Sequence, residues 1–200
     1  MSTEREKDDV IEFHNTSITN KMFSVLLKKK LACPRGHTDE EYATSLGLNI
    51  KITKKKQSLK KLLRSFFDEK LTTSLCKKCR HIHRDNGTER FSIVDFPRYL
   101  VVFADHLDEK TGGFRRPLTR YGTHVDLTKF KEETMKSLGK KFSYSLTAIL
   151  SHEKTSSIDD SMYTAVVKRR VDGQDKKCWF TFNKEEVGEI SEEEALTYPA

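Results

Sequence analysis

Apolar and polar residues alternate along several short stretches of the chain, with the two-residue period that is typical of half-buried β-strands. The clearest stretch is 42–53, where every second residue from Leu46 to Ile52 is aliphatic. Stretch 22–31 interleaves apolar residues with lysines and predicts an amphipathic strand that runs into Cys33. Residues 99–103 are almost continuously apolar, which predicts a strand buried on both faces.

The hydrophobic period changes between residues 58 and 71. Apolar residues recur there at intervals of three and four, which places them on one stripe of an α-helix. They are Leu59, Leu62, Leu63, Phe66 and Phe67. Ser58 stands before this stripe and is predicted to cap the helix.

After residue 80 the pattern returns to strands. Stretches 81–83 and 91–93 flank the pair Asn86 and Gly87, which predicts a β-hairpin. Residues 125–127 form a short predicted strand, and 132–141 a polar loop. Three more strands, 142–150, 162–168 and 178–182, are expected to pair in that order, the last two joined by a turn at 171–173. Side chains predicted to be buried in this sheet are Tyr144, Leu146, Val166, Trp179 and Phe182. The predicted fold class is α+β with a mainly antiparallel sheet.

Two pairs of residues supply ligands that suit a metal ion. Cys33 and His37 lie four positions apart, and Cys76 and Cys79 form a Cys-x-x-Cys pair. Three thiolates and one imidazole are a ligand set of closed, tetrahedral zinc sites. We therefore predict a structural zinc ion at Cys33, His37, Cys76 and Cys79, the competing interpretation being four unrelated residues.

The remaining histidines and the fourth cysteine bear on this assignment. His81 and His83 lie near the second pair and are alternatives to His37, which is favoured because it shares one turn with Cys33. Cys178 stands beside Trp179 in an apolar run and is predicted to be a core residue.

Composition narrows the class of protein. Hydrophobic residues make up 36% of the 200 positions and charged residues 34%, which predicts one thin, exposed part. No stretch approaches the roughly 20 apolar residues of a membrane span, and the charged N-terminus is no secretory signal. Cysteines in metal-like spacing then favour a reducing compartment, cytosol or nucleus.

The net positive charge makes nucleic acid a candidate partner. The formal net charge is +7, and lysines cluster between and beside the two ligand pairs. A basic zinc-ribbon nucleic-acid binder is therefore one hypothesis. The aromatic residues that stack on bases are missing from these clusters, which favours a solvated face instead.

The order of these features resembles the C-terminal half of a ubiquitin-specific protease catalytic domain. Segments that carry the resemblance between and after the ligand pairs are Leu46-Gly-Leu-Asn-Ile50, Glu69-Lys-Leu71, Ile93-Val-Asp-Phe-Pro97-Arg-Tyr-Leu100, Tyr144-Ser-Leu-Thr-Ala-Ile-Leu-Ser-His152 and Trp179-Phe-Thr-Phe182-Asn183 with Val187. The resemblance implies a papain-like fold with zinc-bearing fingers at about 21–90 and a palm at 91–200, after a loose lead-in at 1–20. The thumb of the family is missing.

The resemblance also shows where the catalytic groups differ. In the family, a histidine in a Gly-His-Tyr-x-Ala-Tyr motif activates a cysteine near the start of the domain. The matching segment here is Ser161-Met162-Tyr163-Thr-Ala165-Val166, and no cysteine precedes Cys33. A thioether cannot act as a general base. Only the third catalytic position, Asn183, is retained.

These departures lead to three functional hypotheses. The first is a non-catalytic module that binds ubiquitin or a ubiquitin-like protein, with Tyr163, Ala165 and Trp179 as expected binding residues. The second is an active or partial cysteine deubiquitinase whose cysteine box is missing from this chain. The third is the nucleic-acid binder. His152 and Cys178 are poor replacements for the missing base and nucleophile, and Met162 favours a degenerate paralogue over an incomplete gene model.

Overall fold

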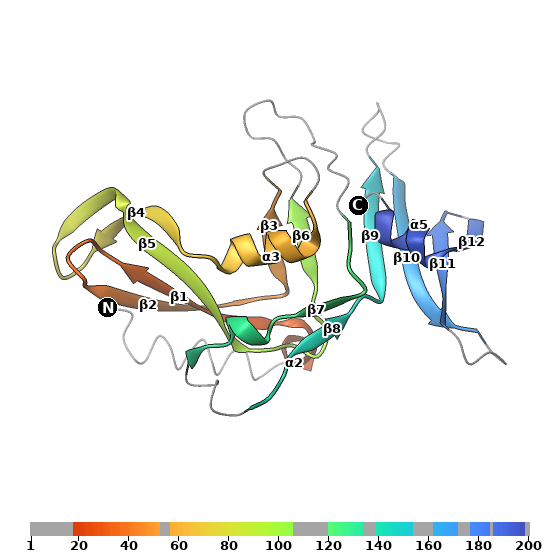
Figure 1. The fold of residues 1–200 in the computed structure, drawn as a ribbon, viewed down its shortest axis with the longest axis horizontal. Helices are drawn as coiled ribbons and strands as arrows, with labels where there is room; N and C mark the ends of the chain where they lie inside the picture. The colour runs from red at the N-terminus through yellow and green to blue at the C-terminus, as the bar shows by residue number, and fades with distance from the viewer. Residues whose placement is uncertain are drawn as a thin grey trace. The chain divides into compact units, whose positions relative to one another are not determined.

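The computed structural model describes residues 18–52, 57–105, 120–133, 139–153, 162–171, 177–184 and 186–198 (Figure 1). Its first half contains α2 (Ile18–Phe23), β1 (Val25–Ala32), β2 (Thr38–Ser45), β3 (Leu48–Lys51), α3 (Leu59–Phe67), β4 (Lys70–Cys76) and β5 (His81–Asp95). Its second half contains β6 (Val102–Asp105), β7 (His124–Asp126), η1 (Thr128–Phe130), β8 (Ser143–Ser145), β9 (Ala148–Glu153), β10 (Met162–Arg170), β11 (Lys177–Asn183), β12 (Glu186–Ile190) and α5 (Glu192–Thr197).

Eight strands form two four-stranded sheets, each within one of two compact units, and β3 pairs with β6 and β7 with β8 in two-stranded sheets. The described parts of Met1–Ile50, Leu63–Phe103 and Asp126–Ser143 make the first unit, whose sheet has the order β2-β1-β5-β4. Those of Lys51–Leu62, Ala104–Val125 and Tyr144–Ala200 make the second, with the order β12-β11-β10-β9. Every ladder in these two sheets is antiparallel, which confirms the predicted fold class. None of the helices in the described parts of the chain has the length and apolar character needed to cross a membrane.

Helix α3 anchors the core of the first unit. Its apolar stripe is buried at Leu63 and Phe67, as the spacing predicts. The ring of Phe67 stacks on Phe130 with centroids 4.3 Å apart, and Phe66 stacks on Phe91 of β5 at 5.3 Å. The last turn of the helix therefore packs against β5, where Ile93 is fully buried.

Several element boundaries in the first unit differ from the predicted ones. Met22 and Phe23 belong to α2, so the predicted strand begins only at Val25. The predicted strand 42–53 is divided into β2 and β3 by a bend at Gly47, where an added Cβ would lie 2.5 Å from the Val101 carbonyl oxygen. Helix α3 ends at Phe67 rather than near 71, because β4 begins at Lys70 and pairs with β5.

The predicted hairpin turn at Asn86 and Gly87 is wrong. These residues lie inside the 15-residue strand β5, at a β-bulge in which residues 84–86 oppose the single residue Thr73. Asp85 has a positive φ of 51°, and its backbone N–H donates to Thr73 Oγ1 at 3.1 Å. The strand therefore continues through this segment, and the irregularity is a bulge rather than a turn.

In the second unit the predicted strand order is confirmed. β9 pairs with β10, and β10 pairs with β11, although the paired residues of β9 are 148–153 rather than the predicted 142–150. The predicted strand 142–150 is divided into β8 and β9, and the predicted turn 171–173 extends outside the described residues. β12 and α5 were not predicted; a capping box between Ser191 and Glu194 begins α5.

The core of the second unit lies on one face of its sheet. Val166 and Trp179 are buried there as predicted, together with Ile149 and with Ala195 of α5. The remaining residues predicted to be buried, Tyr144, Leu146 and Phe182, are half-buried. The predicted burial of residues 99–103 on both faces is wrong, since Tyr99 and Phe103 are about half exposed.

Cross-strand register assigns the faces of this sheet. Thr164 pairs with Ser151 and with Asn183, and Thr164 and Ser151 are buried, so these three residues belong to the inner face that carries the core. Tyr163 pairs with His152 and belongs to the outer face. The outer face leaves three large apolar side chains exposed by 59–67%: Leu150, Tyr163 and Val187.

Candidate functional site

Two hairpin turns present the four predicted metal ligands. The first joins β1 to β2: the Cys33 N–H donates to the His37 carbonyl at 2.9 Å, and Gly36 adopts a φ of 80° that favours glycine. The second turn joins β4 to β5 over residues 77–80, between Cys76 and His81. The two turns lie side by side, although the β1–β5 ladder ends at the pair Ala32 and Thr88, seven residues along β5 from His81.

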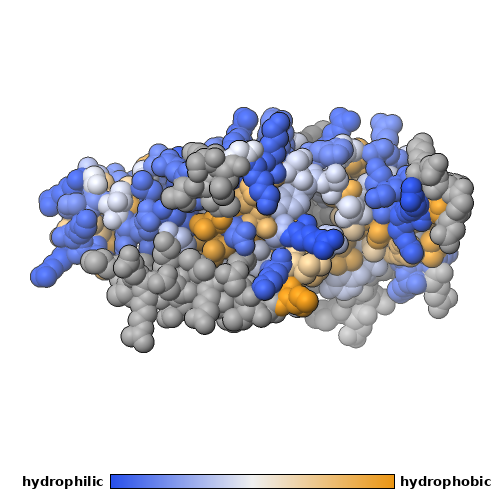
Figure 2. Space-filling view, turned by 90° about the horizontal axis from the view of Figure 1, so that it is seen from below, coloured by the Kyte–Doolittle hydropathy of each residue, from blue (hydrophilic) through white to orange (hydrophobic). Residues whose placement is uncertain are grey.

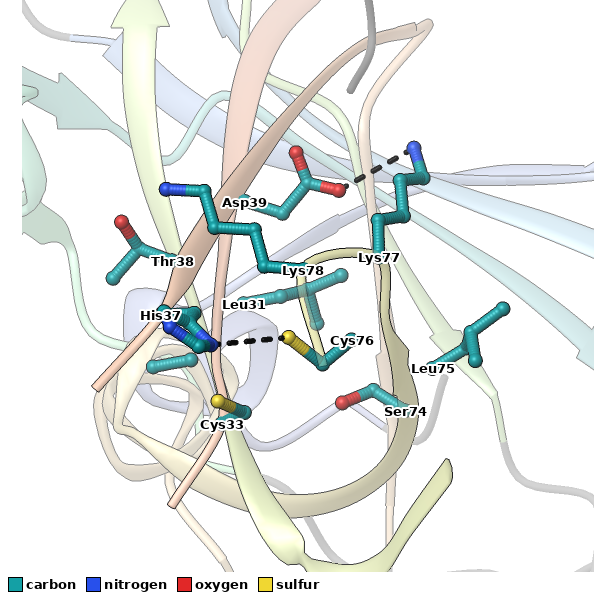
Figure 3. Close-up of a pocket in the computed structure, with 11 residues that line it drawn as sticks. Leu31, Cys33, His37, Thr38, Asp39, Ser74, Leu75, Cys76, Lys77 and Lys78 are labelled. Carbon is teal, nitrogen blue, oxygen red and sulfur yellow. Dashed lines mark hydrogen bonds and ion pairs between the residues drawn. The ribbon is translucent and has the colours of Figure 1, made fainter. Parts of the chain in front are cut away.

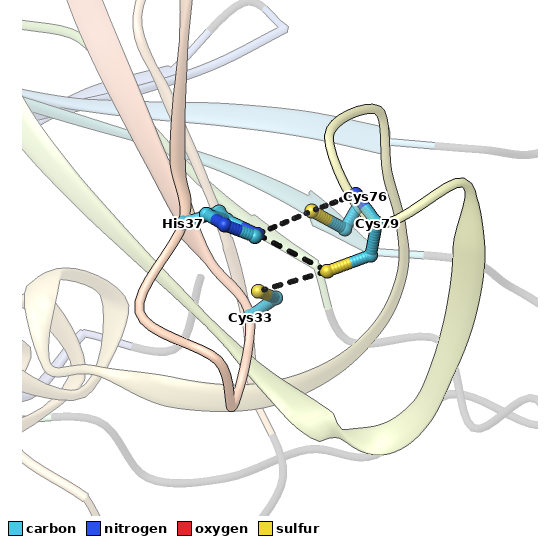
Figure 4. Close-up of side chains that lie close together, drawn as sticks. All are labelled: Cys33, His37, Cys76 and Cys79. Atoms are coloured by element: carbon cyan, nitrogen blue, oxygen red, sulfur yellow. Dashed lines mark hydrogen bonds between the residues drawn. The ribbon is translucent and has the colours of Figure 1, made fainter.

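The structure brings the four side chains together (Figure 4). The Cys33 and Cys79 sulfur atoms are 3.8 Å apart, and His37 Nδ1 lies 3.1 Å from the Cys79 sulfur and 3.7 Å from that of Cys76. All four ligand atoms are within 4.8 Å of one another. A tetrahedral zinc ion with Zn–S bonds of about 2.3 Å separates its sulfur ligands by roughly 3.8 Å. The cluster can therefore hold a metal ion and is compatible with structural zinc.

The electrostatics of the cluster also favour a cation. The backbone N–H of Cys79 donates to the Cys76 sulfur at 3.4 Å and lowers the pKa of Cys76 to about 6. Burial, followed by the neighbouring sulfur of Cys76, raises the pKa of Cys79 to about 11. Without a metal ion, one thiolate thus opposes ionisation of the next thiol. A divalent cation removes that repulsion and displaces the remaining protons.

Side chains around the cluster form a shallow, partly polar pocket (Figure 3). Leu31 and Ala32 of β1 line it with Ser74 and Leu75 of β4. Lys77 lies 3.3 Å from Asp39 and connects the second turn to β2. This ion pair was not predicted; its signal in the sequence is an acid two positions after His37 and a lysine directly after Cys76. His81 and His83 instead contact each other edge to face, with centroids 5.2 Å apart, and are not part of the four-residue cluster.

The positions that match the family's catalytic histidine and asparagine lie close together on the second sheet. Met162 is the first residue of β10, and Asn183 pairs with Thr164, two residues further along the same strand. Strand pairing with Thr164 places Asn183 on the inner face. Asn183 Oδ1 is buried and has no hydrogen-bond partner among the described residues.

The predicted ubiquitin-binding residues are divided between the two faces. Tyr163 and Ala165 lie on the outer face, where Tyr163 is 59% exposed and Ala165 half-buried. Trp179 lies on the inner face and is 2% exposed. The His152 ring stacks on Tyr163 with centroids 4.5 Å apart, so this histidine is also on the outer face. Cys178 is half-buried and pairs with Arg169.

Comparison with solved structures identifies the class of fold. The structure of the SAGA Ubp8/Sgf11/Sus1/Sgf73 DUB module bound to ubiquitin aldehyde matches with a TM-score of 0.71 and 24% identity, over 91% of this chain and 40% of that one. The same module bound to monoubiquitin matches with a TM-score of 0.73 and 21% identity, over 96% and 42%. The yeast SAGA DUB module with a mutant Sgf73 matches with a TM-score of 0.72 and 22% identity, over 95% and 42%. This chain thus has the fold of a ubiquitin-specific protease and spans about two fifths of the length of these solved chains.

Sequence comparison places the chain in a family. The pattern of the ubiquitin carboxyl-terminal hydrolases matches residues 2–199. The chain belongs to the ubiquitin carboxyl-terminal hydrolase family, whose members are cysteine proteases of the deubiquitination pathway. Comparison with curated proteins gives no match.

Proposed function

We propose that this chain is a non-catalytic binding module for ubiquitin or a ubiquitin-like protein. Catalysis in the family needs a thiolate and a histidine that deprotonates it. Met162 occupies the histidine's position in the motif. Cys33, Cys76 and Cys79 belong to the metal cluster, so Cys178 is the remaining thiol.

The placement of His152 carries this proposal. His152 is the histidine nearest in sequence to Met162, and a rescued catalytic pair would require it to reach Asn183. Its ring instead stacks on Tyr163 on the outer face, whereas Asn183 belongs to the inner face with Thr164. A β-sheet separates the two side chains, so the amide has no imidazole to orient.

The outer face supports the binding role. Tyr163 and Ala165 lie there beside Leu150, and Leu150 pairs directly with Ala165. Exposed apolar side chains on neighbouring strands are typical of a protein–protein contact. Trp179 fills the core under β10 and β11 and so supports this surface from the inner face of the sheet. The aromatic ring that is exposed for contact with the partner is that of Tyr163.

Zinc completes the proposal. The Cys3His geometry supports a structural zinc ion that joins the two hairpin turns, whose surroundings bury few apolar side chains. We assign the fingers to about 21–90, the palm to 91–200 and a lead-in to 1–20. Free cysteines with metal-like spacing support a reducing compartment, cytosol or nucleus.

Titration of isotope-labelled ubiquitin with the zinc-loaded chain tests the binding role by NMR. Saturable shift changes are expected, and Tyr163→Asp should weaken binding about tenfold because it places a charge in an apolar contact. Leu46→Asp is the matched control, since Leu46 is 53% exposed but lies in the bend between β2 and β3. No shift changes at millimolar ubiquitin would remove the binding role.

A further inference from the structure

Strand β4 forms one edge of the first sheet. Among the described residues its only ladder is with β5, so its second row of backbone N–H and C=O groups faces outward. The residues of this edge are Lys-Leu-Thr-Thr-Ser-Leu-Cys, with no proline and one charge. The opposite edge, β2, has an acid at three of its eight positions. β4 therefore lacks the charges and prolines that usually protect an edge strand.

The edge is also continuous. The extra residues of the β-bulge belong to β5, so β4 itself keeps a regular backbone over its seven residues. Two hydrogen bonds secure the bulge: Thr73 Oγ1 donates to Asp85 Oδ1 at 3.0 Å, and the Asp85 N–H donates to Thr73 Oγ1. The metal cluster begins at Cys76 and holds the end of the strand. The free edge is thus pre-organised for pairing.

A short apolar ladder runs beside this edge. Leu71 and Leu75 are four positions apart on β4 and so project from the same face, and Ile82 is the cross-strand partner of Leu75. Their exposed fractions are 72%, 60% and 54%. The ladder measures about 13 Å by 10 Å from strand geometry, far below the roughly 800 Å² per partner of a standard globular interface. An extended peptide fits this surface better than a folded domain does.

Charged residues near β4 indicate the composition of that peptide. Lys70 begins the strand, Lys77 and Lys78 follow it, and Arg84 lies at the bulge; all four are exposed. Hydrophilic side chains dominate the left of Figure 2, where the β4–β5 ribbon lies. The end of the edge that meets the second turn is therefore basic, whereas Asp68 and Glu69 precede Lys70 at the other end. An acidic residue at one end of a bound strand complements the basic end.

We propose that β4 is a docking edge for an extended acidic peptide, which adds to the sheet as a fifth strand. Backbone hydrogen bonds to β4 supply much of the affinity, and alternate apolar side chains of the peptide pack beside Leu71 and Leu75. The surface belongs to the first sheet, whereas the proposed ubiquitin contact lies on the second. Failure of one proposal therefore leaves the other unaffected.

The test uses the zinc-loaded full chain and a fluorescent heptapeptide, Glu-Val-Thr-Val-Thr-Val-Glu. Fluorescence polarisation should show saturable binding that weakens with salt. A peptide with both glutamates replaced by lysine should bind at least tenfold more weakly. Leu75→Ser should also reduce affinity about tenfold, with Leu71→Ser as a second variant. Val187→Ser, at a valine that is 63% exposed on β12, is the control and should bind normally.

Amide hydrogen exchange then distinguishes strand addition from a side-on contact. Alternate amides of β4 should gain protection on binding, because every second N–H of an edge strand points outward. The proposal is overturned by equal binding of the lysine peptide, by normal binding to both leucine variants, by unchanged β4 exchange, or by no binding at millimolar peptide.

Discussion

The rings of His152 and Tyr163 stack across β9 and β10 with centroids 4.5 Å apart, on the face of the sheet opposite to Asn183. The histidine nearest in sequence to Met162 thus lies on the other face of the sheet from Asn183, the residue that matches the family's third catalytic position. The His152 ring also covers one side of the exposed Tyr163 ring, which restricts the orientation of that ring in the proposed binding surface.

The substitution Met162→His tests the catalytic side of the account. It restores an imidazole near Asn183 but provides no thiolate for that imidazole to activate. Release of fluorophore from a ubiquitin amide should stay at the level of the buffer blank. Turnover that disappears in a Cys178→Ser background would contradict the non-catalytic assignment.

Removal of one metal ligand tests the zinc site. The zinc-loaded chain should contain about one zinc per molecule by elemental analysis. Cys76→Ser should lower this content to well below half and reduce the melting temperature, because the two hairpin turns lose their connection. Cys178→Ser is the matched control, since Cys178 lies outside the cluster, and should keep its zinc. Unchanged zinc in Cys76→Ser would show that the ion is held elsewhere.

A charged network in the first unit should make stability depend on pH. Lys28 Nζ lies 2.7 Å from Glu40 and 2.9 Å from Glu132, and Ser92 donates to Glu132 as well. Burial alone would raise the pKa of Glu132, but the hydrogen bonds from Ser92 and Lys28 outweigh it and hold this pKa below its ordinary value of 4.5. Such a carboxylate stabilises the folded state above its unfolded pKa, and this contribution is lost as the pH falls through the folded pKa.

The variant Glu132→Gln isolates this contribution. It should cost about 1 kcal/mol near pH 7, a value that allows for partial solvent screening, and the difference from the unsubstituted chain should shrink as the pH falls below 4.5. Melting temperatures measured from pH 3 to pH 7 on both proteins give this difference, and the shared loss of zinc in acid cancels. A difference that is constant over the whole range would show that Glu132 contributes no charge interaction.

Gly47 should be sensitive to the addition of a single methyl group. A Cβ at this position would lie 2.5 Å from the Val101 carbonyl oxygen and 3.0 Å from the Phe103 ring. That oxygen accepts the Leu48 N–H at 2.9 Å, so it cannot move without loss of a hydrogen bond. Gly47→Ala should therefore cost about 1–3 kcal/mol in chemical denaturation. Gly122→Ala, where the nearest atom is 3.4 Å away, should be nearly neutral, and equal costs would refute the steric explanation.

The features predicted from the sequence are those with a strong local cause. Metal ligands occur in few chemical combinations, so the pairing of Cys33 and His37 with the Cys-x-x-Cys pair was readable without a structure. The central strands of the second sheet were readable because Val166 and Trp179 lie within runs of regular period. Here local pattern and tertiary packing agree.

The features that were missed depend on contacts distant in sequence. Asn86 and Gly87 have the chemistry of a turn, but the pairing of β5 with both β1 and β4 makes the segment a bulge. The bend at Gly47 follows from its close approach to Val101, and no local pattern records that contact. Helix α5 carries a capping box at Ser191 but has only six residues, too few to show an apolar stripe.

The central claim, binding of ubiquitin without its hydrolysis, is tested most directly by fluorescence polarisation. The probe is ubiquitin joined through its C-terminal glycine to a fluorophore-bearing lysine, mixed with the zinc-loaded chain. Polarisation should rise with protein concentration to a plateau and then stay constant for hours, because the probe is bound and remains intact. A polarisation that falls with time would show hydrolysis and release of the small fluorophore, and one that never rises would show that ubiquitin is not bound.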